Sequence, residues 1–327
     1  MRNLILPFIL LLTFVFSCRE NDVDEGLEQK NASYDVYISG KDNGDFCYWK
    51  NNVKHLLNYN LTTNETPTKI FVDNNNVYVK GRYGFWKNGN YTTYKQELGI
   101  PSTSVIDIFD IYIKNGNIFF VGYTWASVSS TTLAEFCYWK NGIKNLLFTD
   151  ILAYNDQCTI TEFNSDVYVG AIKKENGIRK SGYFKNTTFN PLFDSSTVSY
   201  QNTNVISNDN NVFFSCQQFY KNLQTNIQVT LPLLPNGFYG GKPALDENDC
   251  YTNAGNDYYY KNGNIIHTPN LSNPLIKDLK VMDQNIYMIR QDPNDIEFKV
   301  YINNVETQSI QNLNFDSSFN NITVVKL

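Results

Sequence analysis

Tyr138-Trp139-Lys140-Asn141-Gly142 is one copy of a short phrase that recurs along this 327-residue chain. The copies are spaced by about 40 to 50 residues, which is typical of repeat architectures. In each copy an aromatic strand runs into Asn-Gly or Asn-Asn, two residues that tolerate positive φ and close a tight hairpin turn. A further strand is therefore expected after each copy. The other copies are Tyr48-Trp49-Lys50-Asn51-Asn52, Phe85-Trp86-Lys87-Asn88-Gly89, Tyr183-Phe184-Lys185-Asn186, Tyr259-Tyr260-Lys261-Asn262-Gly263 and the weaker Val300-Tyr301-Ile302-Asn303-Asn304.

A second pattern precedes each copy and consists of two strands joined by a polar turn. Val72-Asp73-Asn74-Asn75-Asn76-Val77 and Ile113-Lys114-Asn115-Gly116-Asn117-Ile118 are two examples. Together the two patterns give four short antiparallel strands per repeat, which is the blade of a β-propeller. The sequence therefore predicts an all-β fold, a single β-propeller of about seven four-stranded blades.

The ends of the repeat region indicate how the ring closes. The first repeat starts at Asp35-Val36-Tyr37-Ile38 without a leading strand, and the last strand, Asn321-Ile322-Thr323-Val324-Val325, stands alone. The last strand is expected to complete the first blade, which removes open sheet edges. The third strand of the fifth repeat starts at either Phe219 or Ile227, so six or eight blades stay possible, as does an open β-solenoid.

The N-terminal residues have the features of an exported protein. Arg2 precedes an apolar run over residues 4–16, which is shorter than the roughly 20 residues of a membrane-spanning helix. We therefore predict a signal peptide at 1–17. Residues 18–32 are polar and acidic, with too little apolar surface to fold, so we expect a flexible tether there. Residues 33–327 form the propeller domain.

Two features resemble known lipoproteins. Ser17-Cys18 resembles the lipobox of bacterial lipoproteins, in which the cysteine is lipidated, although the family prefers a smaller residue than Phe16; the alternative is an ordinary secretory signal. The acidic residues after Cys18 and the aromatic-Trp-Lys-Asn-Gly repeat resemble those of Bacteroidota propeller lipoproteins, whose function is unassigned. The resemblance implies a lipid anchor in the outer membrane, with the domain facing the cell exterior or, alternatively, the periplasm. It implies no catalytic residue.

Composition excludes some classes of partner and site. The net charge is −5 and the basic residues are scattered, so nucleic-acid binding is not expected. Besides Cys18 the chain has an odd number of cysteines, which allow at most two disulfides. Cys47 and Cys137 share one repeat position and are expected to be buried. No two cysteines have the Cys-x-x-Cys spacing of a zinc site, so no metal is expected from them. No cofactor is expected either. The cysteines are Cys47, Cys137, Cys158, Cys216 and Cys250.

The repeat predicts which end of the propeller binds a ligand. The two tight turns of each blade lie at one end, here called the tight-turn end, and the longer connections lie at the other, the long-loop end. The longer connections are expected at 59–67, 95–104, 123–135, 173–181 and 270–274. Recognition is assigned to the long-loop end, because function concentrates in loops held by rigid strands.

Aligning the innermost strands by their turns places one polar residue from each blade near the channel mouth at the long-loop end. These seven ring residues are Lys69, Asp110, Thr159, Asn204, Lys242, Asp278 and Asn321. They are candidates for holding a polar ligand, water or an ion. The simpler interpretation is that strand ends facing a water-filled channel are polar in any case.

Trp125 lies outside the repeated phrase and follows Tyr123, on what is expected to be a long loop. The pair is a candidate aromatic platform for a sugar or a partner protein. The alternative is that Trp125 covers the end of its own blade. Trp49, Trp86 and Trp139 share one repeat position and are expected to pack between blades.

Enzyme signatures are poor, because the sequence has no nucleophile elbow, no zinc-protease motif and no phosphate loop. His55 and His267 are expected on exposed outer strands. We therefore expect a non-enzymatic surface binding or scaffold protein that presents its loops to a glycan or an envelope protein. The alternatives are a polysaccharide lyase or hydrolase with its site at the channel mouth, and a structural component of an envelope complex.

Overall fold

The computed structural model describes residues 33–59, 65–126, 133–150, 158–194, 203–234, 241–268, 271 and 273–327. Cys18, the signal peptide and the tether lie outside the described residues. The chain divides into a large unit, Val36–Val324, and a small unit formed by residues up to Asp35 together with Val325–Leu327. In the small unit Leu327 N donates to Ser33 O at 2.8 Å. The fold and the site belong to the large unit.

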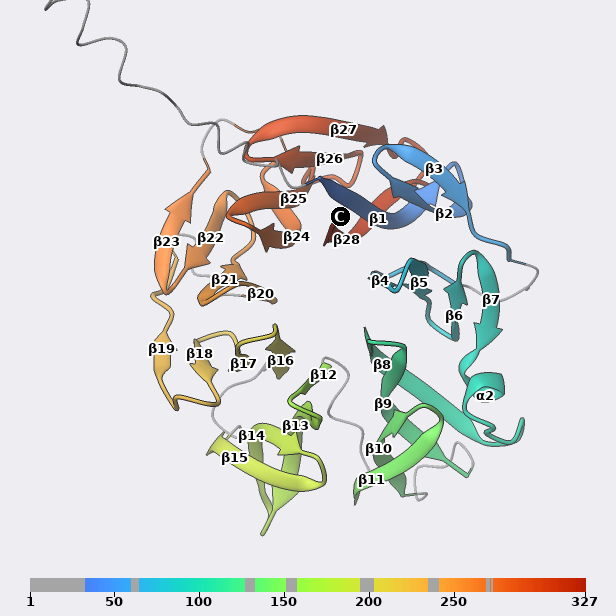
Figure 1. The fold of residues 1–327 in the computed structure, drawn as a ribbon, viewed down its shortest axis with the longest axis vertical. Coiled ribbons are helices and arrows are strands. Elements are labelled where there is room, and N and C mark those ends of the chain that lie inside the picture. Colours follow the sequence, from blue (N-terminus) through green and yellow to red (C-terminus); the bar gives the residue numbers. More distant parts are fainter. Residues whose placement is uncertain are drawn as a thin grey trace, which may run out of the picture. The chain divides into compact units, whose positions relative to one another are not determined.

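The large unit is a β-propeller of seven four-stranded antiparallel blades (Figure 1). From the innermost strand outward, blade 1 is β28 (Ser318–Lys326), β1 (Tyr34–Asp42), β2 (Asp45–Lys50) and β3 (Val53–Leu56); blade 2 is β4 (Lys69–Asp73), β5 (Asn76–Lys80), β6 (Gly84–Lys87) and β7 (Asn90–Thr93); blade 3 is β8 (Val105–Lys114), β9 (Asn117–Trp125), β10 (Ala134–Lys140) and β11 (Ile143–Asp150).

The remaining blades follow the same order. Blade 4 is β12 (Ile160–Phe163), β13 (Asp166–Glu175), β14 (Ile178–Lys185) and β15 (Thr188–Asp194); blade 5 is β16 (Asn204–Ser207), β17 (Val212–Ser215), β18 (Phe219–Asn222) and β19 (Gln228–Thr230); blade 6 is β20 (Pro243–Asp246), β21 (Asp249–Asn253), β22 (Tyr258–Lys261) and β23 (Asn264–His267); blade 7 is β24 (Leu275–Met282), β25 (Asn285–Gln291), β26 (Glu297–Ile302) and β27 (Val305–Gln311).

This arrangement confirms the predicted fold and its closure. β28 pairs with β1, so the C-terminal strand completes the first blade. In the fifth blade both ambiguous segments are strands, because Phe219 begins β18 and the residue after Ile227 begins β19. The count is therefore seven, and the solenoid alternative is wrong.

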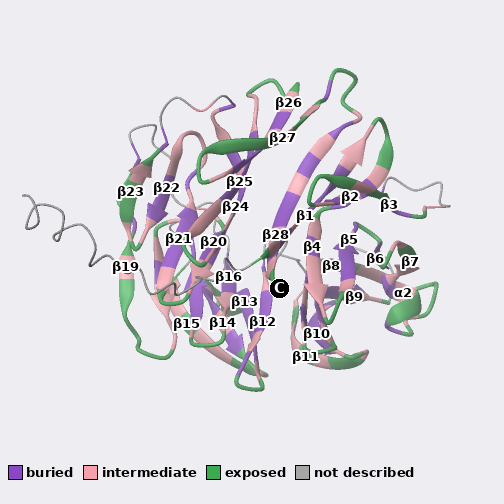
Figure 2. Ribbon diagram, turned by 45° about the horizontal axis from the view of Figure 1, so that its top comes forward, coloured by how far each residue is buried: buried purple, intermediate pink, exposed green. Residues whose placement is uncertain are grey.

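The core lies between neighbouring blades. Trp139 of blade 3 packs in one buried cluster with Tyr78 and Phe85 of blade 2, which confirms the predicted packing of the tryptophans. Trp86 in turn lies edge-on to Phe46 of blade 1, with ring centroids 5.9 Å apart. Buried residues accordingly follow the inner and middle strands, whereas the outer strands are largely exposed (Figure 2).

The asparagine of the repeated phrase does more than close its turn. Asn141 has φ 51°, as predicted, and its Oδ1 also accepts from Ile118 N on the neighbouring strand at 2.9 Å. Its Nδ2 donates to Asn117 Oδ1 at 2.8 Å. In blade 5, Gln224 Oε1 takes the place of this acceptor, at 2.8 Å from Val212 N. The equivalent acceptors elsewhere are Asn51, Asn88, Asn186, Asn262 and Asn303.

The lysine of the phrase lies over an aromatic ring on the adjacent strand. Lys140 Nζ is 5.1 Å from the centroid of Phe119, and the two residues are directly paired in the sheet. Such cation–π contacts on an exposed surface contribute modestly, about 0.5–1 kcal/mol each. The other pairs are Lys50 with Tyr37, Lys87 with Tyr78, Lys185 with Tyr168, and Lys261 with Tyr251.

Three of the predicted long loops are wrong in detail. The segment 123–135 overlaps the end of β9 and the start of β10. Residues 173–181 continue β13 and β14 and turn tightly at Asn176-Gly177, where both residues have positive φ. The segment 95–104 overlaps a one-turn helix, α2 (Tyr94–Glu97), whose first turn is closed by Gln96 N donating to Thr93 Oγ1 at 3.2 Å. The sequence carries a signal for each of the last two features, an Asn-Gly turn and the spacing of a capping box, and the prediction of long loops overlooked both.

Candidate functional site

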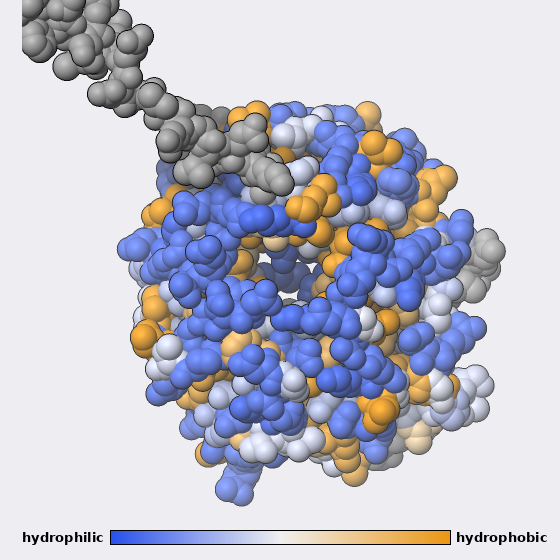
Figure 3. All heavy atoms as spheres, viewed as in Figure 1, coloured by the Kyte–Doolittle hydropathy of each residue, from blue (hydrophilic) through white to orange (hydrophobic). Residues whose placement is uncertain are grey.

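The seven ring residues predicted from the alignment line one cavity at the centre of the propeller. The cavity volume is about 550 Å³, within the range of about 300–1,000 Å³ found for small-molecule sites. Figure 3 shows the central opening bordered by hydrophilic residues. The structure thus brings together residues that lie up to 252 positions apart, from Lys69 to Asn321, and their role in ligand binding stays a prediction.

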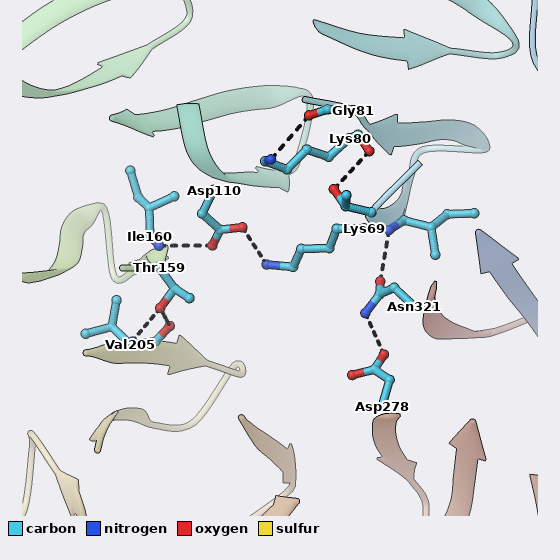
Figure 4. Close-up of polar contacts among 11 residues, drawn as sticks. Lys69, Lys80, Gly81, Asp110, Thr159, Ile160, Val205, Asp278 and Asn321 are labelled. Atoms are coloured by element: carbon cyan, nitrogen blue, oxygen red, sulfur yellow. Dashed lines mark hydrogen bonds and ion pairs between the residues drawn. The ribbon is translucent and has the colours of Figure 1, made fainter. Parts of the chain in front are cut away.

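Four ring residues fasten neighbouring blades to one another, and Figure 4 shows the pairs made by Asp110 and Thr159. Each accepts a hydrogen bond from the backbone N–H that follows the ring position of the next blade. The pairs are Asp110 Oδ2 with Ile160 N at 3.2 Å, Thr159 Oγ1 with Val205 N at 2.6 Å, Asp278 Oδ2 with Ile322 N at 2.9 Å, and Asn321 Oδ1 with Ile70 N at 2.9 Å. Sequence reasoning missed this role, because an acceptor at a strand start does not reveal its neighbour in the ring.

The other three ring residues have no such backbone partner in the described chain. Lys69 Nζ instead forms an ion pair with Asp110 Oδ1 at 2.8 Å. Lys242 is exposed at the cavity. Asn204 is only 4% exposed, yet its Nδ2 has no hydrogen-bond partner in the described chain. The residue that its side chain would fasten in the next blade is Pro243, which has no N–H to donate.

The cavity lining carries more positive than negative charge. Lys69, Lys80, Lys242 and Lys280 line it, against two carboxylates, Asp110 and Asp278, which leaves a formal charge of +2 if all six are ionised. Burial lowers the pKa of Lys80 and of Lys280, because the confined site disfavours the ammonium form. Asp110 opposes this shift at Lys80, and Asp278 opposes it at Lys280.

Lys277 lies beside this cluster, adjacent in sequence to Asp278. Its Nζ donates to Asn320 Oδ1 at 3.0 Å and lies 4.5 Å from the centroid of the Phe298 ring. Burial lowers its pKa to about 8, and the nearby positive charge of Lys242 acts in the same direction. The blades on this side of the ring therefore hold further positive charge close to the cavity.

The predicted aromatic platform is corrected by the structure. Trp125 is the last residue of β9, not part of a loop, and it packs against the buried cluster between blades 3 and 4. Tyr123 is 0% exposed and belongs to that cluster, so it has no surface to offer a ligand. The two rings lie 5.7 Å apart. The pattern misled because the strand continues further than its turn signals indicate.

The cysteines and histidines are in structural positions. All five described cysteines are buried, and none forms a disulfide within the described residues. Burial was predicted for Cys47 and Cys137, and it raises the pKa of each of these two thiols to about 12. His55 and His267 lie on the outer strands β3 and β23, as predicted. In the described ranges, no three His, Cys, Asp or Glu side chains gather closely enough to hold a metal ion.

One buried charge outside the cavity was also missed by sequence reasoning. Arg290 is 0% exposed, and its guanidinium ties the long-loop end of blade 7 to blade 6. Its partners are Asp257, Thr268 Oγ1 at 2.9 Å, Asn273 O at 2.7 Å and Pro274 O at 3.2 Å. A buried guanidinium with four protein partners holds the two blades together through charge-assisted hydrogen bonds.

Comparisons with known proteins give only distant structural likenesses. No protein-family model and no curated protein matches the sequence. A protein of unknown function from Bacteroides caccae is 8% identical, with a TM-score of 0.43, over 90% of this chain and 99% of that one. AztD from Citrobacter koseri is 10% identical, with a TM-score of 0.45, over 90% and 98%. BamB from Moraxella catarrhalis is 13% identical, with a TM-score of 0.43, over 84% and 94%. At these values the likeness carries no information on function.

Proposed function

We propose that this protein is a non-enzymatic binding protein. It binds a polar ligand, either a glycan or a polar group of an envelope protein, in the central cavity at its long-loop end. The observation that carries the proposal is the convergence of one polar side chain from each of seven blades on a single cavity of about 550 Å³. A small number of convergent polar groups in a preformed cavity is the usual design of a ligand site.

The proposal includes a lipid anchor at Cys18 in the outer membrane, with the domain facing the cell exterior. The support is the Ser17-Cys18 resemblance and the polar segment 18–32. No helix among the described residues is both long and apolar enough for a membrane span. The anchor predicts that Cys18→Ser prevents incorporation of labelled palmitate, and incorporation that persists in this variant would exclude it.

The path of the chain suits this arrangement. Val36, the first residue of the large unit, is bonded to the tight turn at Asn51: Asn51 N donates to Val36 O at 2.9 Å, and Val36 N donates to Asn51 Oδ1 at 2.8 Å. The chain therefore enters the propeller at the tight-turn end, and the ring residues lie toward the opposite end.

The geometry gives less support to the two alternatives. An enzyme of the glycosidase type needs two carboxyl groups free to act on substrate, whereas Asp110 and Asp278 both accept backbone N–H bonds that hold blades together. A structural component of a complex would favour one apolar blade edge. The exposed aliphatic side chains are instead spread over the outer strands of several blades, as at Leu56, Leu146 and Val305.

The test is a glycan-array screen of the full chain in detergent, with Lys242→Glu and Trp125→Ala variants beside it. Binding that is lost in Lys242→Glu and kept in Trp125→Ala supports the cavity as the site. Binding that is lost only in Trp125→Ala moves the site to the edge of blade 3. An absence of binding to every glycan rejects the glycan version of the proposal and leaves the envelope protein as its ligand.

A further inference from the structure

We infer that the cavity is an anion site, in which an oxyanion of the ligand lies between Lys242 and Asn204, and that Lys280 and Lys80, which also line the cavity, add to its positive charge. Within the proposed binding function, on which this inference rests, the matching ligand is an acidic glycan that presents a carboxylate. The chemistry shared by a carboxylate and a phosphate is an oxyanion that accepts several hydrogen bonds from donors.

The first argument is the unused donor of Asn204. A buried amide without a partner is rare in native proteins and calls for an explanation. Here the explanation is local, because four other ring residues bond the next blade's backbone N–H and Asn204 meets Pro243 instead. The position is thereby released from fastening the ring. Asn204 lines the cavity and keeps a buried N–H₂ group with no partner among the described residues, and a bound oxyanion would supply the missing acceptor.

The second argument is that Lys242 lies at the adjoining ring position. Asn204 begins β16 and Lys242 directly precedes β20, and these are the innermost strands of neighbouring blades. Lys242 lines the cavity, and its Nζ makes no hydrogen bond or ion pair with another described residue. The two neighbouring ring positions that do not fasten the ring therefore both offer donors and no competing carboxylate.

The third argument is the balance of charge deeper in the cavity. The two aspartates are occupied: Asp110 accepts from Lys69 and from Ile160 N, and Asp278 Oδ2 accepts from Asn321 as well as Ile322 N. Besides burial, Lys69 and Lys242 lower the pKa of Lys280, which shows like charges close together. A bound anion reduces the repulsion among these ammonium groups, whereas a bound cation would be repelled by them.

The test is isothermal titration of the full chain in detergent with three probes: D-glucuronate, D-glucose and inorganic phosphate. We expect glucuronate to bind at one site per chain, at least tenfold more tightly than glucose, which has the same ring without the carboxylate. Lys242→Met and Asn204→Asp are each expected to weaken glucuronate binding at least tenfold. The matched control is Lys54→Met on the outermost strand of blade 1, which is expected to leave the affinity unchanged.

The outcomes separate this inference from the proposed function. Equal affinity for glucose and glucuronate overturns the anion site and leaves a binding cavity in place. Tight binding of phosphate with none of glucuronate keeps the anion site and overturns the acidic glycan. If none of the probes binds, and glycans bind on the array regardless of Lys242→Glu, both the anion site and the cavity are rejected. Asn204→Leu serves as a second variant, since it removes the donor without adding a charge and its unfolding temperature reports whether the fold is intact.

Discussion

At the scale of single residues, the repeated asparagine shows why one side chain type returns in blade after blade. A tight hairpin turn needs positive φ, which glycine provides as well as asparagine does. Only asparagine also supplies an acceptor for the neighbouring strand and a donor for the preceding turn, as Asn141 does toward Ile118 and Asn117. The phrase is thus a structural device and not a binding motif.

This role predicts that Asn141→Gly destabilises the protein although it suits the backbone. The variant keeps the positive φ and loses two side-chain hydrogen bonds, so we expect the free energy of unfolding to fall by about 1–2 kcal/mol. Asn115→Gly is the matched control, because Asn115 also has positive φ, at 52°, and its side chain bonds to no described residue. Urea denaturation measures both, and an equal loss in the two variants would contradict the role.

Lys277 gives the stability of the folded protein a dependence on pH. Its pKa of about 8 lies below the ordinary 10.5, chiefly because burial disfavours the charged form. Between these values the unfolded chain binds a proton that the folded chain does not, so stability rises with pH through this window. We expect the free energy of unfolding of the wild type minus that of Lys277→Met to rise by about 1–3 kcal/mol from about pH 7.5 to about pH 10.

Lys54→Met is the control for this pH series. Burial acts to lower the pKa of Lys54, but the hydrogen bond to Asp42 together with the nearby charges of Asp42 and Asp45 outweighs burial, and the pKa is raised. The contribution of Lys54 is therefore fully present below about 10.5 and is lost only above it. A flat difference curve for Lys277→Met, like the one expected for Lys54→Met, would show that Lys277 titrates normally.

At the scale of single elements, a bulge in an innermost strand brings its backbone very close to the backbone of the next strand. The pairing of β8 with β9 shifts register between Ile108 and Asp110, and Gly122 of β9 lies opposite Ile108. A Cβ atom added at Gly122 would lie 1.9 Å from Asp107 O. The bulge that aims Asp110 at its neighbours in the ring therefore depends on a glycine in the next strand.

We expect Gly122→Ala to destabilise the protein by about 3 kcal/mol or more, because the backbone carbonyl has no room to move within a packed blade. Gly116→Ala is the comparison, since a Cβ there meets nothing within 4 Å and only the positive φ of 76° is disfavoured, at a cost of about 1 kcal/mol. Thermal unfolding of both variants decides the matter, and a smaller effect at Gly122 than at Gly116 would contradict it.

Sequence reasoning succeeded with most elements whose turn chemistry was explicit. The Asn-Gly and Asn-Asn turns of the repeat fixed the strands and, through them, the alignment of the seven ring residues. It failed at β9, which extends past its signals to Trp125, and at 173–181, where the explicit turn signal Asn176-Gly177 was taken for part of a long loop. Which ring residue fastens a blade depends on its neighbour around the ring. At Asn204 that neighbour is a proline 39 positions away, a relation that no local pattern records.

At the scale of the whole molecule, the ring is held closed by β28, whose side chains pack against the other strands of blade 1. Phe319 of β28 is 0% exposed and meets Trp49 of β2 edge-on, with ring centroids 4.9 Å apart. Large aromatic side chains in such sites contribute through contact area and through their edge-to-face geometry. The closure thus depends on packing as well as on strand pairing.

Phe319→Ala is expected to lower the free energy of unfolding by about 3–5 kcal/mol. Phe315→Ala, in the loop just before β28, is the matched control, because Phe315 is 76% exposed and its loss is expected to cost less than about 1 kcal/mol. Hydrogen exchange adds a second readout: β1 amides should exchange faster in Phe319→Ala. Protection of β1 that matches the wild type would argue against a closing role for Phe319.

The pairing of β28 with β1 also sets an order of events during synthesis. β1 is the first strand of the ring to be made, and its innermost partner is made only after every other blade is complete in sequence. Until then the inner edge of β1 has unpaired backbone N–H and C=O groups, with which a strand of another chain could pair. A nascent chain that paused before Ser318 would carry six complete blades and one open one. The protein therefore has a period of exposure whose length is set by the time needed to synthesise the other blades, and a chaperone that shields β1 would act in that interval.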